Sequence, residues 1–172
     1  MFAVPRGSVL IIGIICFAVF LTEGTVLDWS AVYLTDVRAI PASLGGLGYT
    51  CFAIAMTVAR LTGDRIISSL GRLPVVLGGA LVAAAGMAMV TFIDSWPLAL
   101  LGYTLVGAGC ANIVPVMFSA AGRQTVMPQA VAVPAITTLG YLGVLSGPAV
   151  IGYVAHYTHL AFSFSLIMAL ML

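Results

Sequence analysis

The chain reads Arg60-Leu61-Thr62-Gly63-Asp64-Arg65 and then Gly71-Arg72 at the most highly charged interruption of an otherwise apolar sequence. This interruption separates the second from the third of six apolar stretches. A helix that crosses a bilayer needs about 20 apolar residues, whereas transmembrane strands alternate apolar and polar positions. Because the stretches are continuous, they predict an all-α, multi-pass membrane protein with helices over residues 8–34, 44–63, 74–93, 97–121, 130–155 and 160–172.

The overall composition points to the same class of protein. Hydrophobic residues make up 62% of the 172 residues, charged residues make up 6%, and the mean hydropathy is +1.21. A soluble domain carries about 25% charged residues, so this chain could not keep a protein surface hydrated. The sequence contains no lysine and its net charge is +1. These values exclude the basic face that nucleic-acid binding requires.

The cysteine and histidine positions indicate neither a metal site nor a cofactor. Cys16, Cys51 and Cys110 lie far apart inside apolar stretches and lack the spacing of metal ligands. His156 and His159 stand alone in an expected outer turn. The sequence has no Ser-His pairing, no His/Glu metal motif and no glycine-rich phosphate loop on suitable elements. We therefore predict that the protein is not an enzyme.

The arginine positions predict the orientation in the membrane. Cytoplasmic loops carry an excess of arginine and lysine. With a cytoplasmic N-terminus, only Arg38 falls outside, and the remaining arginines fall inside: Arg6, Arg60, Arg65, Arg72 and Arg123. The last stretch, residues 160–172, would rise only about 20 Å as a helix, against a hydrocarbon core of about 30 Å. We therefore expect the last helix to be truncated.

The charged interruption resembles the signature loop of the major facilitator superfamily, which follows the second helix of each six-helix half. Asp64-Arg65 and Gly71-Arg72 match its Asp-Arg and Gly-Arg pairs. Two features differ: Arg60 occupies the position of an expected glycine, and residues 66–70 separate the two pairs. The resemblance implies a tight cytoplasmic turn whose charged contacts break and reform between transport states. The alternative is a solvated loop whose arginines only set the orientation.

Three further segments resemble the bacterial fucose-permease-like inner-membrane transporters of this superfamily. Residues 23–34, residues 112–123, and residues 139–143 together with Gly147-Pro148 are similar to their seventh, tenth and eleventh helices. The resemblance implies that residues 1–172 form one domain, the C-terminal six-helix half of a twelve-helix transporter in the inner (cytoplasmic) membrane. Such a half needs an N-terminal half or a dimer partner. The implied substrate is a small solute, such as a sugar or another polar metabolite, with proton coupling as an option.

Polar side chains inside the expected helices are candidates for the transport site. A charge at the bilayer centre costs about 2.5–3.5 kcal/mol, so an acid there is a functional hypothesis by default. Glu23 lies about 22 Å from the inner end of its helix, nearer the outer side, and is the strongest candidate for a substrate or proton site. The alternative is a carboxyl that only pairs with a neighbouring helix. Asp28 and Trp29 lie nearer the outer interface, where they either anchor the helix end or line the solute path.

Asn112 is the other candidate, three residues before Pro115. A proline in a membrane helix leaves a carbonyl unpaired one turn back. Asn112 therefore either satisfies broken backbone or donates a hydrogen bond to the solute. From the rise per residue of an α-helix, Glu23 and Asn112 differ in membrane depth by roughly 14 Å, so we expect no contact between them.

Small residues and prolines in the fifth stretch predict close helix packing or a hinge. Gly143 and Gly147 form a small-xxx-small face, followed by Pro148. Together these features favour secondary transport of a small solute. The alternative is a membrane assembly or scaffold protein, or an inactive transporter fragment.

Overall fold

In the computed structural model, which describes residues 5–172, every regular element is a helix. This confirms the predicted all-α class. In chain order the elements are α1 (Ser8–Val32), the π-helical turn η1 (Tyr33–Val37), the 3₁₀ turn η2 (Ala42–Leu44), α2 (Leu47–Leu61), α3 (Gly63–Leu70), α4 (Arg72–Phe92), α5 (Trp96–Cys110), α6 (Ile113–Ala121), α7 (Gln129–Tyr157) and α8 (Leu160–Leu170).

Within the described part of the chain, five segments are long and apolar enough to cross a membrane, as a multi-pass membrane protein requires. α8 is a shorter apolar helix. Lipid offers no hydrogen bonds to the backbone, so continuous apolar runs become helices whose boundaries follow the hydropathy closely. The five spans are Ser8–Val37, Ala42–Leu61, Arg72–Phe92, Trp96–Ala121 and Gln129–Tyr157.

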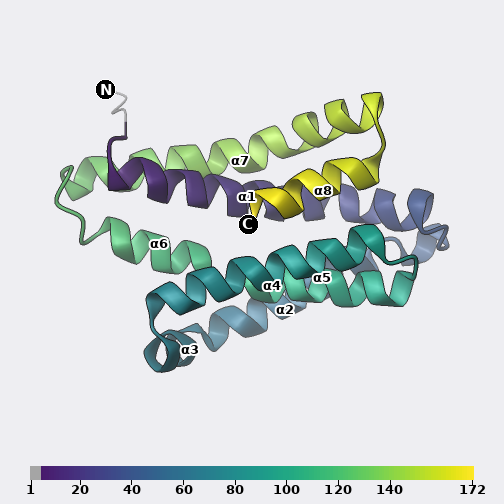
Figure 1. Cartoon of the computed structure of the whole chain (residues 1–172), viewed down its shortest axis with the longest axis horizontal. Coiled ribbons are helices and arrows are strands. Elements are labelled where there is room, and N and C mark those ends of the chain that lie inside the picture. Colours follow the sequence, from purple (N-terminus) through teal and green to yellow (C-terminus); the bar gives the residue numbers. More distant parts are fainter. Residues whose placement is uncertain (1–4) are drawn as a thin grey trace.

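The helices form two groups that lie side by side (Figure 1). α1 packs against α7, and α2 and α4 pack against α5. α8 bridges the groups by contacting both α4 and α7. One buried apolar cluster runs through both groups. In it, the ring of Phe164 on α8 stacks on Tyr33 of η1, with the ring centroids 4.6 Å apart.

Small residues allow the backbones of paired helices to approach closely. On the α4–α5 interface, Gly86 lies directly against Gly102, so a side chain at either position would overlap the partner backbone. On the α1–α7 interface, Gly143 lies against the Phe17 backbone, and Gly147 lies at ordinary contact distance from Thr25. Such approaches are typical of membrane helices, which associate through packing and not through exclusion of water.

The charged interruption folds differently from the expected tight turn. Residues 63–70 form the short helix α3, with polar residues on one face and Ile66 and Ile67 partly buried on the other. The residues that separate Asp64-Arg65 from Gly71-Arg72 are the ones that complete this helix. Gly71 ends it with φ at +83°, a conformation that glycine adopts without strain. Asp64 lies in the first turn, where the helix dipole favours a negative charge.

Four arginines gather at one end of the bundle, where α3 and the α6–α7 connection lie (Figure 1). They are Arg6, Arg65, Arg72 and Arg123. Arg38 lies at the opposite end, and its side chain is only 7% exposed. Its guanidinium pairs with Asp94 and donates to the carbonyls of Val90 (2.7 Å) and Thr91 (3.2 Å). Arg38 therefore ties η1 to the C-terminal end of α4, where helix carbonyls lack intrahelical partners.

Candidate functional site

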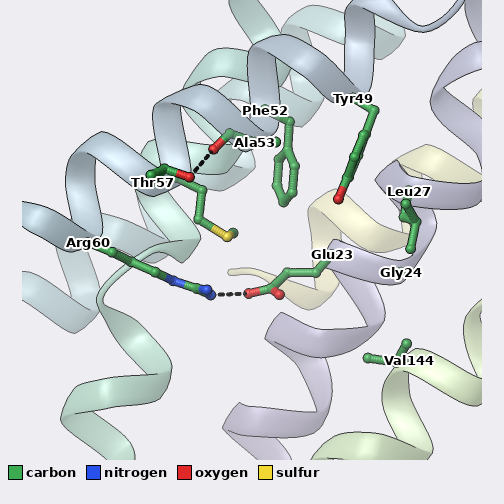
Figure 2. Close-up of a pocket in the computed structure, with 10 residues that line it drawn as sticks. Glu23, Gly24, Leu27, Tyr49, Phe52, Ala53, Thr57, Arg60 and Val144 are labelled. Carbon is green, nitrogen blue, oxygen red and sulfur yellow. Dashed lines mark hydrogen bonds and ion pairs between the residues drawn. The ribbon is translucent and has the colours of Figure 1, made fainter.

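A cavity of about 300 Å³ lies between α1 and α2, with α7 contributing to its wall (Figure 2). It contains one acid and one base, which face each other across the space between the two helices. The remaining lining is aromatic, apolar or weakly polar. The residues that line it are Glu23, Gly24, Leu27, Tyr49, Phe52, Ala53, Met56, Thr57, Arg60 and Val144.

Glu23 lies at the centre of the first span. The span runs for 30 residues from Ser8 to Val37, with 15 residues before Glu23 and 14 after it. This places the backbone of Glu23 roughly 21–22 Å from either end. η1 continues the first helix beyond the expected limit at residue 34, so Glu23 lies closer to the middle of this helix than the expected bounds 8–34 implied. Its side chain is 18% exposed, and its Oε1 accepts a hydrogen bond from Nη2 of Arg60 at 3.2 Å.

Arg60 lies in the last turn of α2, within the helix expected over residues 44–63, although it was also assigned to the signature loop. Its side chain extends from α2 toward Glu23 on α1 (Figure 2). Side chains on a helix lean toward its N-terminus, so a long side chain near the end of α2 points back along the helix. An arginine near a membrane surface ordinarily extends toward water. Arg60 instead reaches toward the middle of the first span.

Asn112 and Pro115 lie at a break in the fourth span, where α5 ends and α6 begins. Pro115 has no N–H, so the Ala111 carbonyl one turn earlier lacks its helical donor. Nε of Arg60 donates to that carbonyl at 3.3 Å. Asn112 is buried, and its Nδ2 donates to the carbonyl of Ala59 at 3.0 Å. Arg60, and not Asn112, therefore donates to the carbonyl that Pro115 leaves without its helical donor, and Asn112 donates to the backbone of α2.

Glu23 and Asn112 do not line the same cavity. Within residues 5–172 no hydrogen bond joins them, and Arg60 and its neighbour Ala59 stand between them. Asn112 borders a second, largely apolar cavity of about 370 Å³ beside α3, α4 and α5. The two polar residues that the sequence singled out are thus linked through α2.

Asp28 and Trp29 lie outside the cavity around Glu23. Asp28 is exposed. Trp29 is partly buried, and the edge of its ring lies beside Gly152 of α7. The Nε1 atom of Trp29 is buried without a hydrogen-bond partner in the described part of the chain. The structure therefore brings Glu23 alone of the four candidates to this cavity.

The α2 side of the cavity was not predicted from the sequence. Tyr49 and Phe52 point from α2 into the space that faces α1 (Figure 2), with their ring centroids 6.0 Å apart. The α2 lining residues recur at the three- and four-residue spacing of one helix face. That stripe ends at the charged residue Arg60, and this combination was the signal available in the sequence. The stripe consists of Tyr49, Phe52, Ala53, Met56, Thr57 and Arg60.

The chemistry that this arrangement offers is binding, by paired charges beside aromatic rings. The carboxylate and the guanidinium provide acceptors and donors, and the rings provide an apolar wall. Within residues 5–172, no group of three or more His, Cys, Asp or Glu side chains is arranged to hold a metal ion.

Comparison with known proteins identifies relatives along nearly the whole chain. An uncharacterized MFS-type transporter of Yersinia pestis is 51% identical over 172 residues, which is 100% of this chain and 45% of the relative. Membrane protein MosC of Rhizobium meliloti is 36% identical over 86% of this chain and 36% of its own length. The uncharacterized transporter y4wD of Sinorhizobium fredii is 34% identical over 88% of this chain and 40% of its own length. No family model matches. The chain thus spans less than half the length of these relatives.

Proposed function

We propose that this chain, which is similar along its full length to an MFS-type transporter, forms part of the solute path of a secondary transporter of the major facilitator superfamily. The observation that carries this proposal is the Glu23–Arg60 pair, which lies in a cavity at the middle of the first span. Ionisable side chains within membrane helices are costly, and they mark substrate and ion pathways. Secondary transporters bind their solutes near the bilayer midplane.

The charges of the pair indicate the kind of solute. With Glu23 ionised, Glu23 and Arg60 together carry no net charge, so in that state a solute with a net charge would remain uncompensated in the cavity. Within the described residues, Oε2 of Glu23 has no donor and Nη1 of Arg60 has no acceptor. One free acceptor and one free donor group therefore lie beside the rings of Tyr49 and Phe52. We propose an uncharged polar or zwitterionic solute, such as a sugar or another polar metabolite, with the proton as coupling ion at Glu23.

The wider assembly is also part of the proposal. Residues 1–172 would form the C-terminal six-helix half of a fucose-permease-like transporter, with an N-terminal half or a second copy closing the cavity. The clustering of four arginines at the α3 end supports a cytoplasmic N-terminus and a cytoplasmic position for the loop around Asp64, Arg65, Gly71 and Arg72. Bacterial relatives named as transporters support the inner membrane and favour transport over a scaffold role.

The test is uptake by a chimera in which this chain replaces the matching 45% of the Yersinia relative. Proteoliposomes would be offered radiolabelled glucose, myo-inositol, serine, lactate and arginine, with the unmodified relative as the reference. We expect saturable uptake of an uncharged or zwitterionic solute, with a loss of at least about tenfold, or 1.4 kcal/mol, in Glu23→Gln and in Arg60→Gln. Uptake of lactate or arginine alone, or equal uptake by the two variants and the unsubstituted chimera, would refute this proposal.

A further inference from the structure

We propose that Pro115 and Asn112 are positioning residues for Arg60, and that they hold its guanidinium in the orientation in which it meets Glu23. Their role in transport rests on the proposed function. Their role in positioning rests on hydrogen bonds alone.

Pro115 acts through a carbonyl that it leaves without a partner. In an α-helix the N–H of residue 115 would donate to the carbonyl of Ala111, and proline has no N–H. Ala111 is fully buried in a membrane span, where a carbonyl without a donor is costly. Nε of Arg60 supplies the missing donor at 3.3 Å. The proline therefore leaves an acceptor that a side chain of the neighbouring helix α2 satisfies.

Asn112 completes a reciprocal contact between the same two backbones. The carbonyl of Ala59 lies in the last turn of α2, where backbone donors are incomplete, and it also accepts from the Thr62 hydroxyl at 3.3 Å. Nδ2 of Asn112 donates to it at 3.0 Å. The adjacent residues Ala59 and Arg60 thus exchange two hydrogen bonds with the adjacent residues Ala111 and Asn112.

The tether determines where the guanidinium points. Arg60 is 44% exposed, and a free arginine at this end of α2 would extend toward the membrane surface. The guanidinium is planar and rigid, so fixing Nε on the Ala111 carbonyl also fixes the direction of both terminal nitrogens. One of them, Nη2, meets Glu23, and Nη1 is left for a solute. A lysine has a single nitrogen and cannot bind both partners in this way.

The first experiment uses NMR on the chain in lipid nanodiscs to measure the rate of hydrogen exchange at the arginine Nε–H groups. The Arg60 signal is the one that disappears in Arg60→Gln. We expect it to exchange at least about tenfold more slowly than the signal of the exposed Arg123. Pro115→Ala restores the competing N–H, so the Arg60 rate should rise toward that of Arg123, and Asn112→Ala should raise it partly. Pro134→Ala, at another proline inside a helix, should leave it unchanged.

A second measurement needs no change at Pro115, so it stands even if that variant does not fold. Asn112 is the only asparagine in the chain, so labelling alanine carbonyls with ¹³C and asparagine nitrogen with ¹⁵N selects the Ala111 carbonyl alone. We expect Arg60→Gln to shift this carbonyl resonance upfield, because its hydrogen bond is lost, and Arg123→Gln to leave it in place.

Failure of the positioning role and failure of the proposed transport function give different results. An Ala111 carbonyl shift that is the same in Arg60→Gln and Arg123→Gln, or an Arg60 exchange rate that Pro115→Ala does not change, would overturn the positioning role. In the chimera, Pro115→Ala should raise the KM for the transported solute about tenfold with a smaller change in kcat, since binding geometry is lost. Unchanged KM together with faster Arg60 exchange would restrict the role of Pro115 to structure. Absence of uptake in every chimera would refute the proposed function and leave the NMR result standing.

Discussion

Nη2 of Arg60 lies 3.2 Å from Oε1 of Glu23, although one residue belongs to the last turn of α2 and the other to the middle of α1. The two partners differ in what happens when the other is lost. Glu23 is 18% exposed and held at mid-span, whereas Arg60 is 44% exposed at a helix end. An arginine that loses Glu23 keeps its hydrogen bond to the Ala111 carbonyl and stays partly exposed, while within residues 5–172 a Glu23 carboxylate that loses Arg60 has no other partner.

The first prediction is therefore an unequal loss of stability. After discounting for the exposure of Arg60, Arg60→Gln should lower the free energy of unfolding by about 1–2 kcal/mol, and Glu23→Gln by less than about 1 kcal/mol. Unfolding by SDS in mixed micelles, followed by circular dichroism, measures both values. Equal losses, or a larger loss in Glu23→Gln, would contradict the inference that the Glu23 carboxylate depends on Arg60 more than Arg60 depends on Glu23.

The second prediction concerns the coupling role of Glu23. In the chimera, uptake driven by a proton gradient should depend on pH between about pH 5 and pH 8, and Glu23→Gln should remove gradient-driven accumulation while leaving folding intact. Accumulation ratios measured at several pH values test this directly. Asp28→Asn is the matched control, because Asp28 is an exposed acid of the same helix that lies outside the cavity. If Glu23→Gln accumulated solute as the unsubstituted chimera does, Glu23 would have no coupling role.

The hydropathy pattern was sufficient to predict the membrane-spanning helices, but it did not predict the structure of the segments that connect them. A lipid environment forces continuous apolar runs into helices, so the spans lie close to the expected stretches. α3 was missed because it has only eight residues and few apolar ones, so its pattern resembles a loop. The extension of α1 through η1 was missed because Thr35 and Asp36 make this segment more polar than the helix that it continues.

The site was predictable as single residues but not as a set. Glu23 and Asn112 stood out because each is a polar residue in an apolar run. Arg60 was misplaced because sequence position indicates the depth of its Cα, and not the direction of its long side chain. The exchange between Ala59–Arg60 and Ala111–Asn112 depends on the packing of α2 against α5, which no local pattern encodes.

The third prediction concerns Gly63, where α2 passes into α3. A Cβ at this position would overlap Oδ1 of Asn112, so Gly63→Ala should push the carboxamide away from Ala59 and cost about 1–3 kcal/mol. Gly78→Ala is the matched control: it lies inside α4, and a Cβ there meets nothing within 4 Å. That control should be neutral or stabilise the protein by up to about 1 kcal/mol. Similar effects of the two substitutions in the same SDS titration would show that Asn112 does not occupy this position.

The fourth prediction separates the two roles of Arg38, which are an ion pair with Asp94 and hydrogen bonds to the carbonyls of Val90 and Thr91. Asp94 is 95% exposed, so the ion pair itself contributes little, and Asp94→Asn should cost less than about 1 kcal/mol. Arg38→Gln removes the donor to the Val90 carbonyl and leaves the Thr91 carbonyl with only the 3.4 Å hydrogen bond from the Tyr33 hydroxyl, so it should cost about 2 kcal/mol. It should also speed hydrogen exchange in η1 more than in α7, because Arg38 ties η1 to α4. If Asp94→Asn were the more costly change, the ion pair and not the carbonyl contacts would hold this end of the bundle together.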